Sequence, residues 1–246
     1  MSIKESAKQI ISDGLLKIIK NYTEIALLIN ACDISKNRYK KMEQEIALST
    51  TQNIPSELRL DLEFDVQFSK EELVREYENK LIENICENYI ISSISITDAI
   101  LEDLYNLFLK YYDNSLSDTN IENKVRSAWA NENMINFLTN EDKVNLKTPS
   151  GYETGIIESF YRYSELRIMR HSLVHTSGKI SDRNINKLKS YYEQTPDERK
   201  SSSLYNSFLY DADNEIILNI NNILLIRKYL DNFLMYIYKG IDEKTF

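Results

Sequence analysis

The two histidines of this chain, His171 and His175, lie four residues apart, and Arg167 and Arg170 come just before them. An α-helix advances about 100° per residue, so these four side chains would share one sector of roughly 140°. A neutral imidazole can take a proton from a hydroxyl, and an imidazolium can return one to a leaving oxygen. A guanidinium can hold a phosphate through two parallel hydrogen bonds. This set, without a set of metal ligands, suits attack of an RNA 2′-hydroxyl on its adjacent phosphate.

The element that must position these side chains is predicted to be a helix with one apolar face. Leu166, Met169 and Leu173 fall on the side opposite the arginines and histidines. Gly178 is well placed to take the left-handed conformation past the last turn, and Lys179 favours the negative end of the helix dipole. We therefore expect the four polar side chains on the last turns of a helix that stops near Gly178.

The sequence Arg170-His-Ser-Leu-Val-His175, followed by Thr-Ser-Gly178, resembles the R-x4–6-H motif of HEPN-domain proteins. A polar residue commonly follows the arginine in that family, and His171 fits this position. The family fold is an antiparallel helical bundle, and many members are metal-independent endoribonucleases whose composite site forms where two protomers meet. The resemblance implies phosphate contact by Arg170, acid/base work by His175 and support from His171. Arg167 lies outside the motif, so its phosphate-binding role rests on the helical wheel alone.

The resemblance is clearest over residues 153–181 and looser over 70–239, and it does not extend to 1–68. It implies a homodimer that cleaves single-stranded RNA without a cofactor or metal, as a toxin of a toxin–antitoxin system or an antiviral-defence effector. One alternative is a non-catalytic HEPN-like module that binds RNA, a nucleotide or a protein partner. Another is a structural subunit whose histidines cap a helix end. Members paired with nucleotidyltransferases carry a Tyr where this chain has Ser177, so modification at this position is not expected, although a nucleotidyltransferase partner stays open.

Composition supports a mainly helical fold. Only 5 Gly and 3 Pro occur in 246 residues, which favours long helices and few tight turns. The lone Cys32 and Cys86 are expected to be buried thiols, because their spacing matches no zinc site or disulfide framework. The chain has no run of 18 apolar residues and no apolar segment typical of a secretory signal, so we expect no membrane partner and a cytoplasmic location.

The charge distribution singles out the same region. The net charge of −8 argues against a general nucleic-acid coat protein. Residues 162–200 nevertheless hold nine Lys and Arg against five Asp and Glu, a local +4, whereas the rest of the chain carries −12. A phosphate-binding site on an acidic body would need such a region, although chance unevenness is the simpler alternative.

The predicted fold class is mainly all-α: an antiparallel helical bundle with a minor two-stranded β element. We expect a single HEPN-like domain over 1–246, with N-terminal helices and a strand in 1–68 and the bundle core in 69–240. Apolar periodicity and capping signals predict helices over 3–30, 34–49, 69–91, 95–112, 119–138, 183–193 and 221–239.

Two other stretches are predicted to be non-helical. The alternation of apolar and polar residues over 58–68 predicts a strand, paired either with 215–220 or with its copy in a second subunit. Residues 194–214 are predicted to form a long mobile loop close in sequence to the site, either a lid over it or, as we favour, a disordered segment.

Several aromatic and apolar side chains carry further expectations. Trp129 is predicted to anchor the core rather than stack on a base. The tyrosines that flank the site in sequence are candidates for contact with a base: Tyr161, Tyr163, Tyr191 and Tyr192. An apolar face is a candidate for part of the dimer contact: Ile156, Phe160 and Tyr163.

Overall fold

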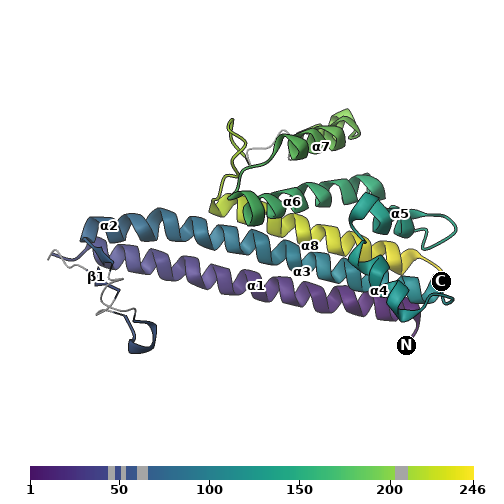
Figure 1. The fold of residues 1–246 in the computed structure, drawn as a ribbon, viewed down its shortest axis with the longest axis horizontal. Helices are drawn as coiled ribbons and strands as arrows, with labels where there is room; N and C mark the ends of the chain where they lie inside the picture. The colour runs from purple at the N-terminus through teal and green to yellow at the C-terminus, as the bar shows by residue number, and fades with distance from the viewer. Residues whose placement is uncertain (44–47, 51–53, 60–65, 203–209) are drawn as a thin grey trace.

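The computed structural model describes residues 1–43, 48–50, 54–59, 66–202 and 210–246. It is an antiparallel helical bundle with one small β element, so the predicted fold class is confirmed (Figure 1). The α-helices are α1 (Ile3–Lys40), α2 (Lys70–Arg75), α3 (Leu81–Tyr112), α4 (Asp118–Arg126), α5 (Asn133–Thr139), α6 (Ile156–Thr176), α7 (Asp182–Glu193) and α8 (Ile220–Glu243). Short 3₁₀ turns cover Ser56–Leu58, Ala130–Glu132 and Asp197–Ser202, and one π-helical stretch, Glu76–Lys80, joins α2 to α3.

The two longest helices, α1 and α3, run antiparallel along the length of the molecule (Figure 1). Helices α6 and α8 pack beside one half of α3, and α7 lies over α6. The other half of α1 continues with α2 and the start of α3 as a two-helix arm that extends past the end of α6. None of the described helices has the length and apolar character needed to cross a membrane.

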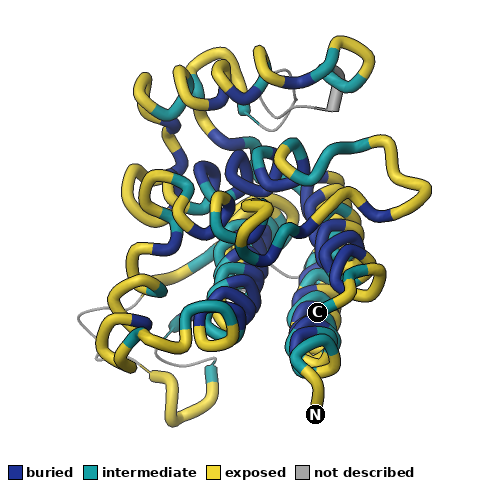
Figure 2. Tube along the Cα trace, turned by 90° about the vertical axis from the view of Figure 1, so that its right-hand side faces the viewer, coloured by how far each residue is buried: buried dark blue, intermediate teal, exposed yellow. Residues whose placement is uncertain are grey.

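The core runs along the contacts between these helices, as the buried residues in Figure 2 show. Helix α1 contributes residues at helical spacing, such as Ile11, Ile18 and Ile25, and burial of each such side chain stabilises the fold by about 1.5–3 kcal/mol. Helices α6 and α8 meet through aromatic rings: the centroid of Phe233 lies 5.6 Å from that of Phe160 and 4.9 Å from that of Tyr163. The same core therefore holds the helix that carries the candidate site.

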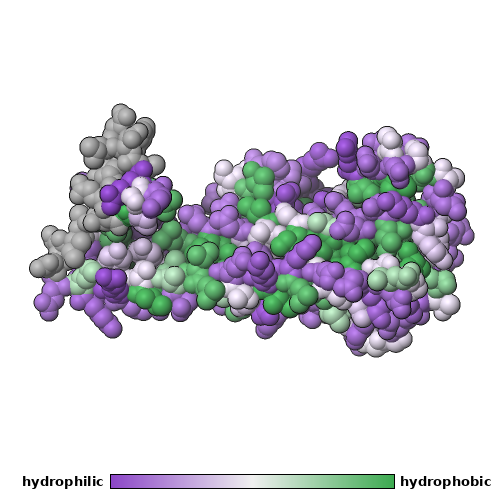
Figure 3. Space-filling view, turned by 90° about the horizontal axis from the view of Figure 1, so that it is seen from below, coloured by the Kyte–Doolittle hydropathy of each residue, from purple (hydrophilic) through white to green (hydrophobic). Residues whose placement is uncertain are grey.

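The long helices also have a partly apolar face, on the side of the molecule away from α7 (Figure 1). Figure 3 shows hydrophobic side chains gathered along the face seen from below. The large exposed apolar side chains of α1 are Leu16, Ile19, Leu27, Leu28 and Ile34. A polar face would be the usual expectation for a helix on the surface of a monomer.

The predicted division of the N-terminal region into two helices is wrong, because α1 continues to Lys40. Residues 31–33 contain no Gly or Pro, and Cys32 is buried, so nothing stops the helix there. Of the predicted helix over 34–49, residues 44–47 lie outside the described residues, and Leu48–Ser49 form strand β1.

The capping box at Ser69 is confirmed, since Ser69 and Glu72 bond each other's backbone N–H groups. The second predicted start, at Ser95, is wrong because α3 passes through it without a break. The Ser95 hydroxyl donates to the Ile91 carbonyl instead, and Thr97 bonds the Ser93 carbonyl in the same way. The predicted helix over 119–138 is also wrong, because it is broken between α4 and α5, where Asn131 has a φ of 50° and Glu132 a φ of 59°.

The strand predicted over 58–68 is confirmed only at its end. Strand β2 (Gln67–Phe68) pairs antiparallel with β1 (Leu48–Ser49), so neither predicted partner is the observed one. Leu58 closes a 3₁₀ turn, and residues 60–65 lie outside the described residues. The predicted loop over 194–214 is wrong in part, because Asp197–Ser202 form a helical turn, while residues 203–209 are again not described.

Candidate functional site

The end of α6 is built as the sequence predicts. Its inner face buries Leu166, Met169 and Leu173. The helix ends with Ser177 at a φ of 50° and Gly178 at a φ of 87°, and the Gly178 N–H donates to the Ser172 carbonyl at 3.0 Å. The polar sector therefore lies on the last turns of a helix with a fixed stop.

A second segment holds this helix end in place. The Ile216 N–H donates to the Gly178 carbonyl at 3.0 Å, and the Ile180 N–H donates to the Asn214 carbonyl at 2.9 Å. An isolated antiparallel bridge joins Lys179 to Glu215. The run 215–220, which the sequence offered as a strand partner, thus fixes the end of the helix that carries the histidines.

His171 and His175 are brought together as neighbouring rings. Both side chains are exposed, and their ring centroids lie 4.6 Å apart. Partial burial lowers the pKa of His171, and the adjacent His175 and arginines lower it further. His171 is therefore held towards its neutral form, in which one ring nitrogen can accept a proton.

Arg170 lies half-buried on the same turns. Its Nε is buried and has no hydrogen-bond partner among the described residues. A buried donor without an acceptor costs free energy, so such a group calls for a physical explanation. A bound anion would supply the missing acceptor and would also meet the guanidinium charge.

Arg167 is in a different state, which the helical wheel did not reveal. Its Nε donates to the Asp98 carboxylate at 2.7 Å, and its guanidinium carbon lies 3.7 Å from the centroid of the Trp129 ring. Burial raises the pKa of the Asp98 carboxyl, and the Arg167 guanidinium beside it offsets part of that rise. The charge of Arg167 is thus already balanced within the fold, which weakens its predicted role as a phosphate ligand.

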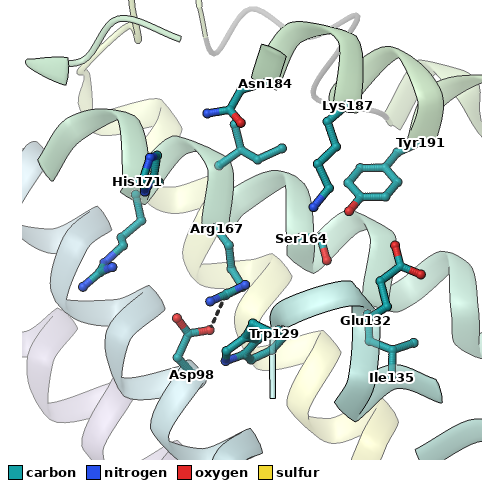
Figure 4. A pocket seen from close by; sticks show the side chains of 12 residues that line it. Asp98, Trp129, Glu132, Ile135, Ser164, Arg167, His171, Asn184, Lys187 and Tyr191 are labelled. Atoms are coloured by element: carbon teal, nitrogen blue, oxygen red, sulfur yellow. Dashed lines mark hydrogen bonds and ion pairs between the residues drawn. The ribbon is translucent and has the colours of Figure 1, made fainter. Parts of the chain in front are cut away.

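Trp129 is half-buried and packs against the core, as expected for an anchor. Its Nε1–H donates to the Glu102 carboxylate at 2.8 Å, and its ring supports Arg167 from below (Figure 4). Asp98 also accepts a 2.8 Å hydrogen bond from the Tyr163 hydroxyl. These partners come from α3 and from the link between α4 and α5, so no local pattern in the sequence pointed to them.

A pocket of about 230 Å³ opens between α6, α7 and the link between α4 and α5 (Figure 4). Among its described lining residues, Arg167, Arg170 and His171 belong to the predicted cluster, whereas His175 does not line it. The residues that sequence reasoning missed include Glu132 and Lys187. Tyr191, a predicted candidate for base contact, also lines the pocket, although its side chain is largely buried and stacks on Tyr161 at 4.8 Å between ring centroids.

The local positive charge is partly neutralised. Arg162 is buried and pairs with Glu165 at 3.1 Å, and Arg199 pairs with Glu158 at 3.0 Å.

Among the predicted dimer-contact residues, Phe160 and Tyr163 are fully buried within the subunit's own core. These two side chains have no surface to offer a second subunit, so the prediction is wrong for them, whereas Ile156 is half-buried and its role stays a prediction.

Comparison of the chain with protein-family models, with curated proteins and with solved structures finds no match. The HEPN resemblance therefore stays a prediction from the sequence.

Proposed function

We propose that this chain is a homodimeric HEPN-type endoribonuclease, which cleaves single-stranded RNA without a metal ion. The observation that carries the proposal is the end of α6, where two exposed imidazoles lie 4.6 Å apart and the buried Nε of Arg170 lacks a partner among the described residues. The last turns of α6 thus carry two proton-transfer groups and a guanidinium whose Nε could take an anion as its acceptor.

In the proposed reaction, a neutral His175 removes the proton of an RNA 2′-hydroxyl. The resulting oxygen attacks the adjacent phosphorus, and Arg170 stabilises the charge that builds on the non-bridging oxygens. The bond to the 5′-oxygen breaks, and an imidazolium returns a proton to it. The products are a 2′,3′-cyclic phosphate and a 5′-hydroxyl. In a two-fold dimer, the second subunit brings a further imidazole to the same cleft.

The test is cleavage of single-stranded RNA by the purified full-length chain in EDTA. We expect products with 2′,3′-cyclic phosphate ends, and we expect His175→Ala and Arg170→Ala each to slow cleavage by about 100-fold or more. Arg126→Ala is the matched control, because Arg126 is exposed on α4, outside the α6 cluster and its pocket. Cleavage that survives both site substitutions would remove the catalytic assignment.

The second candidate is a non-catalytic module that binds RNA, a nucleotide or a protein partner. The pocket favours this function, because Arg167 is already paired with Asp98 and His175 is not among the described residues that line the pocket. Tight binding of RNA that stays intact would favour this function, and neither binding nor cleavage would favour a structural role.

An active nuclease of this kind would suit a toxin or an antiviral effector, restrained by a protein partner such as a nucleotidyltransferase. Growth arrest on expression of the native chain, but not of His175→Ala, is the expected outcome.

A further inference from the structure

The pocket beside α6 has one surface that suits a flat ring. The Arg167 guanidinium lies 3.7 Å from the centroid of the Trp129 ring, and its Nε is fixed by a 2.7 Å hydrogen bond to Asp98. Aromatic rings and guanidinium planes are the side-chain surfaces on which RNA bases stack. Trp129 covers one face of the Arg167 guanidinium. The Arg167 side chain is still 28% exposed and lines the pocket, so a base in the pocket could stack on its exposed part.

Two opposite charges enter the pocket from opposite sides. Figure 4 shows Lys187 reaching in from α7 and Glu132 from the link between α4 and α5, with the Tyr191 side chain between them. Neither side chain takes part in an ion pair among the described residues, and the Lys187 ammonium lies over the Tyr191 ring, 5.6 Å from its centroid. The Ser164 hydroxyl and the Asn184 amide lie along the same pocket. The pocket thus offers an acceptor group on one side and donors on the other.

This arrangement distinguishes among the four bases. A carboxylate with two oxygens is best satisfied by two adjacent N–H donors. Guanine alone presents such a pair, N1–H and the 2-amino group, whereas the amino groups of adenine and cytosine stand beside a ring nitrogen that accepts. Guanine also presents O6 and N7 as two neighbouring acceptors, to which lysine commonly donates. Uracil offers a single N–H between two carbonyl groups.

The backbone at Glu132 supports a functional role for this side chain. Asn131 and Glu132 have consecutive φ values of 50° and 59°, a conformation that asparagine tolerates but that costs free energy for glutamate. The Asn133 amide donates to the Ser127 carbonyl at 3.1 Å across this turn. The fold thus holds Glu132 at the pocket in an unfavourable conformation, which is a common property of binding sites.

We propose that this pocket is a subsite for one guanine base, stacked on Arg167, with Glu132 accepting from N1–H and the 2-amino group and Lys187 donating to O6 or N7. Its volume of about 230 Å³ is below the roughly 300–1,000 Å³ of pockets for drug-sized ligands, so it suits a single base. Arg170, the proposed phosphate-binding residue, lines the same pocket, so a bound base would lie near the phosphate attached to it. The role of Arg170 in this inference rests on the proposed function. Binding of the base does not, and it can be measured without cleavage.

The experiment is calorimetric titration of the full-length chain with the 3′-monophosphates of guanosine, adenosine, cytidine and uridine. We expect the dissociation constant of guanosine monophosphate to be at least about tenfold lower than those of the other three. Glu132→Gln should abolish this preference, and Lys187→Met should weaken guanosine binding several-fold. Glu141→Gln and Lys189→Met are the matched controls, because both residues are exposed and neither lines the pocket.

Each outcome separates this inference from the proposed nuclease activity. Equal binding of the four nucleotides, preference for another base, or no binding would overturn the guanine subsite even if the chain cleaves RNA. Cleavage without preference for a guanosine next to the cut would overturn it as well. Guanosine binding that Glu132→Gln removes, in a chain that leaves RNA intact, would support the subsite and overturn the nuclease.

Discussion

At the scale of single residues, two arginines three positions apart on one helix have different environments. Arg167 is held by Asp98 and by the ring of Trp129, whereas the buried Nε of Arg170 has no acceptor among the described residues. The first arginine therefore contributes to the stability of the fold, and the second is suited to bind a ligand. Their spacing on the helical wheel placed both arginines in one polar sector and did not distinguish them.

We predict that Arg167→Ala lowers the free energy of unfolding by about 1–3 kcal/mol, because it leaves the largely buried Asp98 carboxylate without its cationic partner and with only the Tyr163 hydroxyl as a donor among the described residues. Arg170→Ala should change it by less than about 1 kcal/mol, because no protein hydrogen bond of Nε is lost. Urea unfolding followed by circular dichroism measures both, with Arg126→Ala as the surface control. Equal losses for the two arginines would contradict this assignment.

A second prediction concerns His171, whose pKa is lowered by partial burial and then by His175 and the arginines. The unfolded chain takes up this proton near its ordinary pKa of about 6.5, while the folded chain resists until lower pH. The free energy of unfolding should therefore fall as pH drops through about 6.5. His171→Asn should make that fall shallower in unfolding curves measured between pH 7.5 and pH 5.

Titration of the imidazole proton signals by NMR tests the cause directly. The midpoint of His171 should lie below that of a model peptide and should move towards it in His175→Asn, which removes the second cause of the shift. A midpoint that stays fixed in this variant would remove His175 from the explanation.

The residue-scale features that could be predicted from sequence are those set by near neighbours. The left-handed Gly178 and the apolar face with Leu166 and Met169 follow from spacing along one helix. Asp98 could not be predicted, because it lies 69 positions from Arg167 and becomes its partner only when α3 packs against α6. Long-range ion pairs depend on the fold as a whole.

At the scale of elements, most of the wrong predictions concern where one helix ends and the next begins. Hydroxyl residues such as Ser95 resemble helix starts in sequence, yet their side chains can bond back to a carbonyl within a continuous helix. The alternation over 58–68 predicted a strand correctly at Gln67–Phe68 but not its partner, since pairing depends on the return of the chain. Strong capping boxes and long apolar periods, as at Ser69 and in α8, were read correctly.

Gly14 shows how closely two elements approach. A Cβ at this position would lie 2.3 Å from Cδ1 and 2.5 Å from Cγ1 of Ile100, so α1 and α3 need a glycine here. Alanine would gain about 1 kcal/mol of helix propensity, but the overpacking costs about 1–3 kcal/mol. We predict that Gly14→Ala lowers the free energy of unfolding in denaturant titrations.

The matched test adds Ile100→Ala to the same chain. Alone, this change should destabilise by about 2–4 kcal/mol through the cavity that it leaves. Combined with Gly14→Ala, it should cost less than the sum of the two single changes, because the new methyl group occupies part of the space. Strict additivity would show that the two side chains do not compete.

At the scale of the whole molecule, the proposed nuclease needs two subunits, and the buried Phe160 and Tyr163 are excluded from the contact between them. We predict that equimolar Arg170→Ala and His175→Ala chains, each strongly slowed alone, recover part of the RNA cleavage when they are mixed after brief unfolding and refolding. In a composite site, a heterodimer can supply the arginine from one chain and the histidine from the other. Confirmed heterodimers without cleavage would argue for sites contained within one subunit.

The bridge between residues 178–180 and 214–216 has a consequence for how fast the site can respond. Because the last turn of α6 is fastened from outside the helix, it should not fray as free helix ends do, and the amide protons of Ile180 and Ile216 should exchange slowly with solvent. The two imidazoles then keep their orientation before any substrate arrives. Little entropy would remain to be lost on binding, so that association would be governed by diffusion rather than by a folding step.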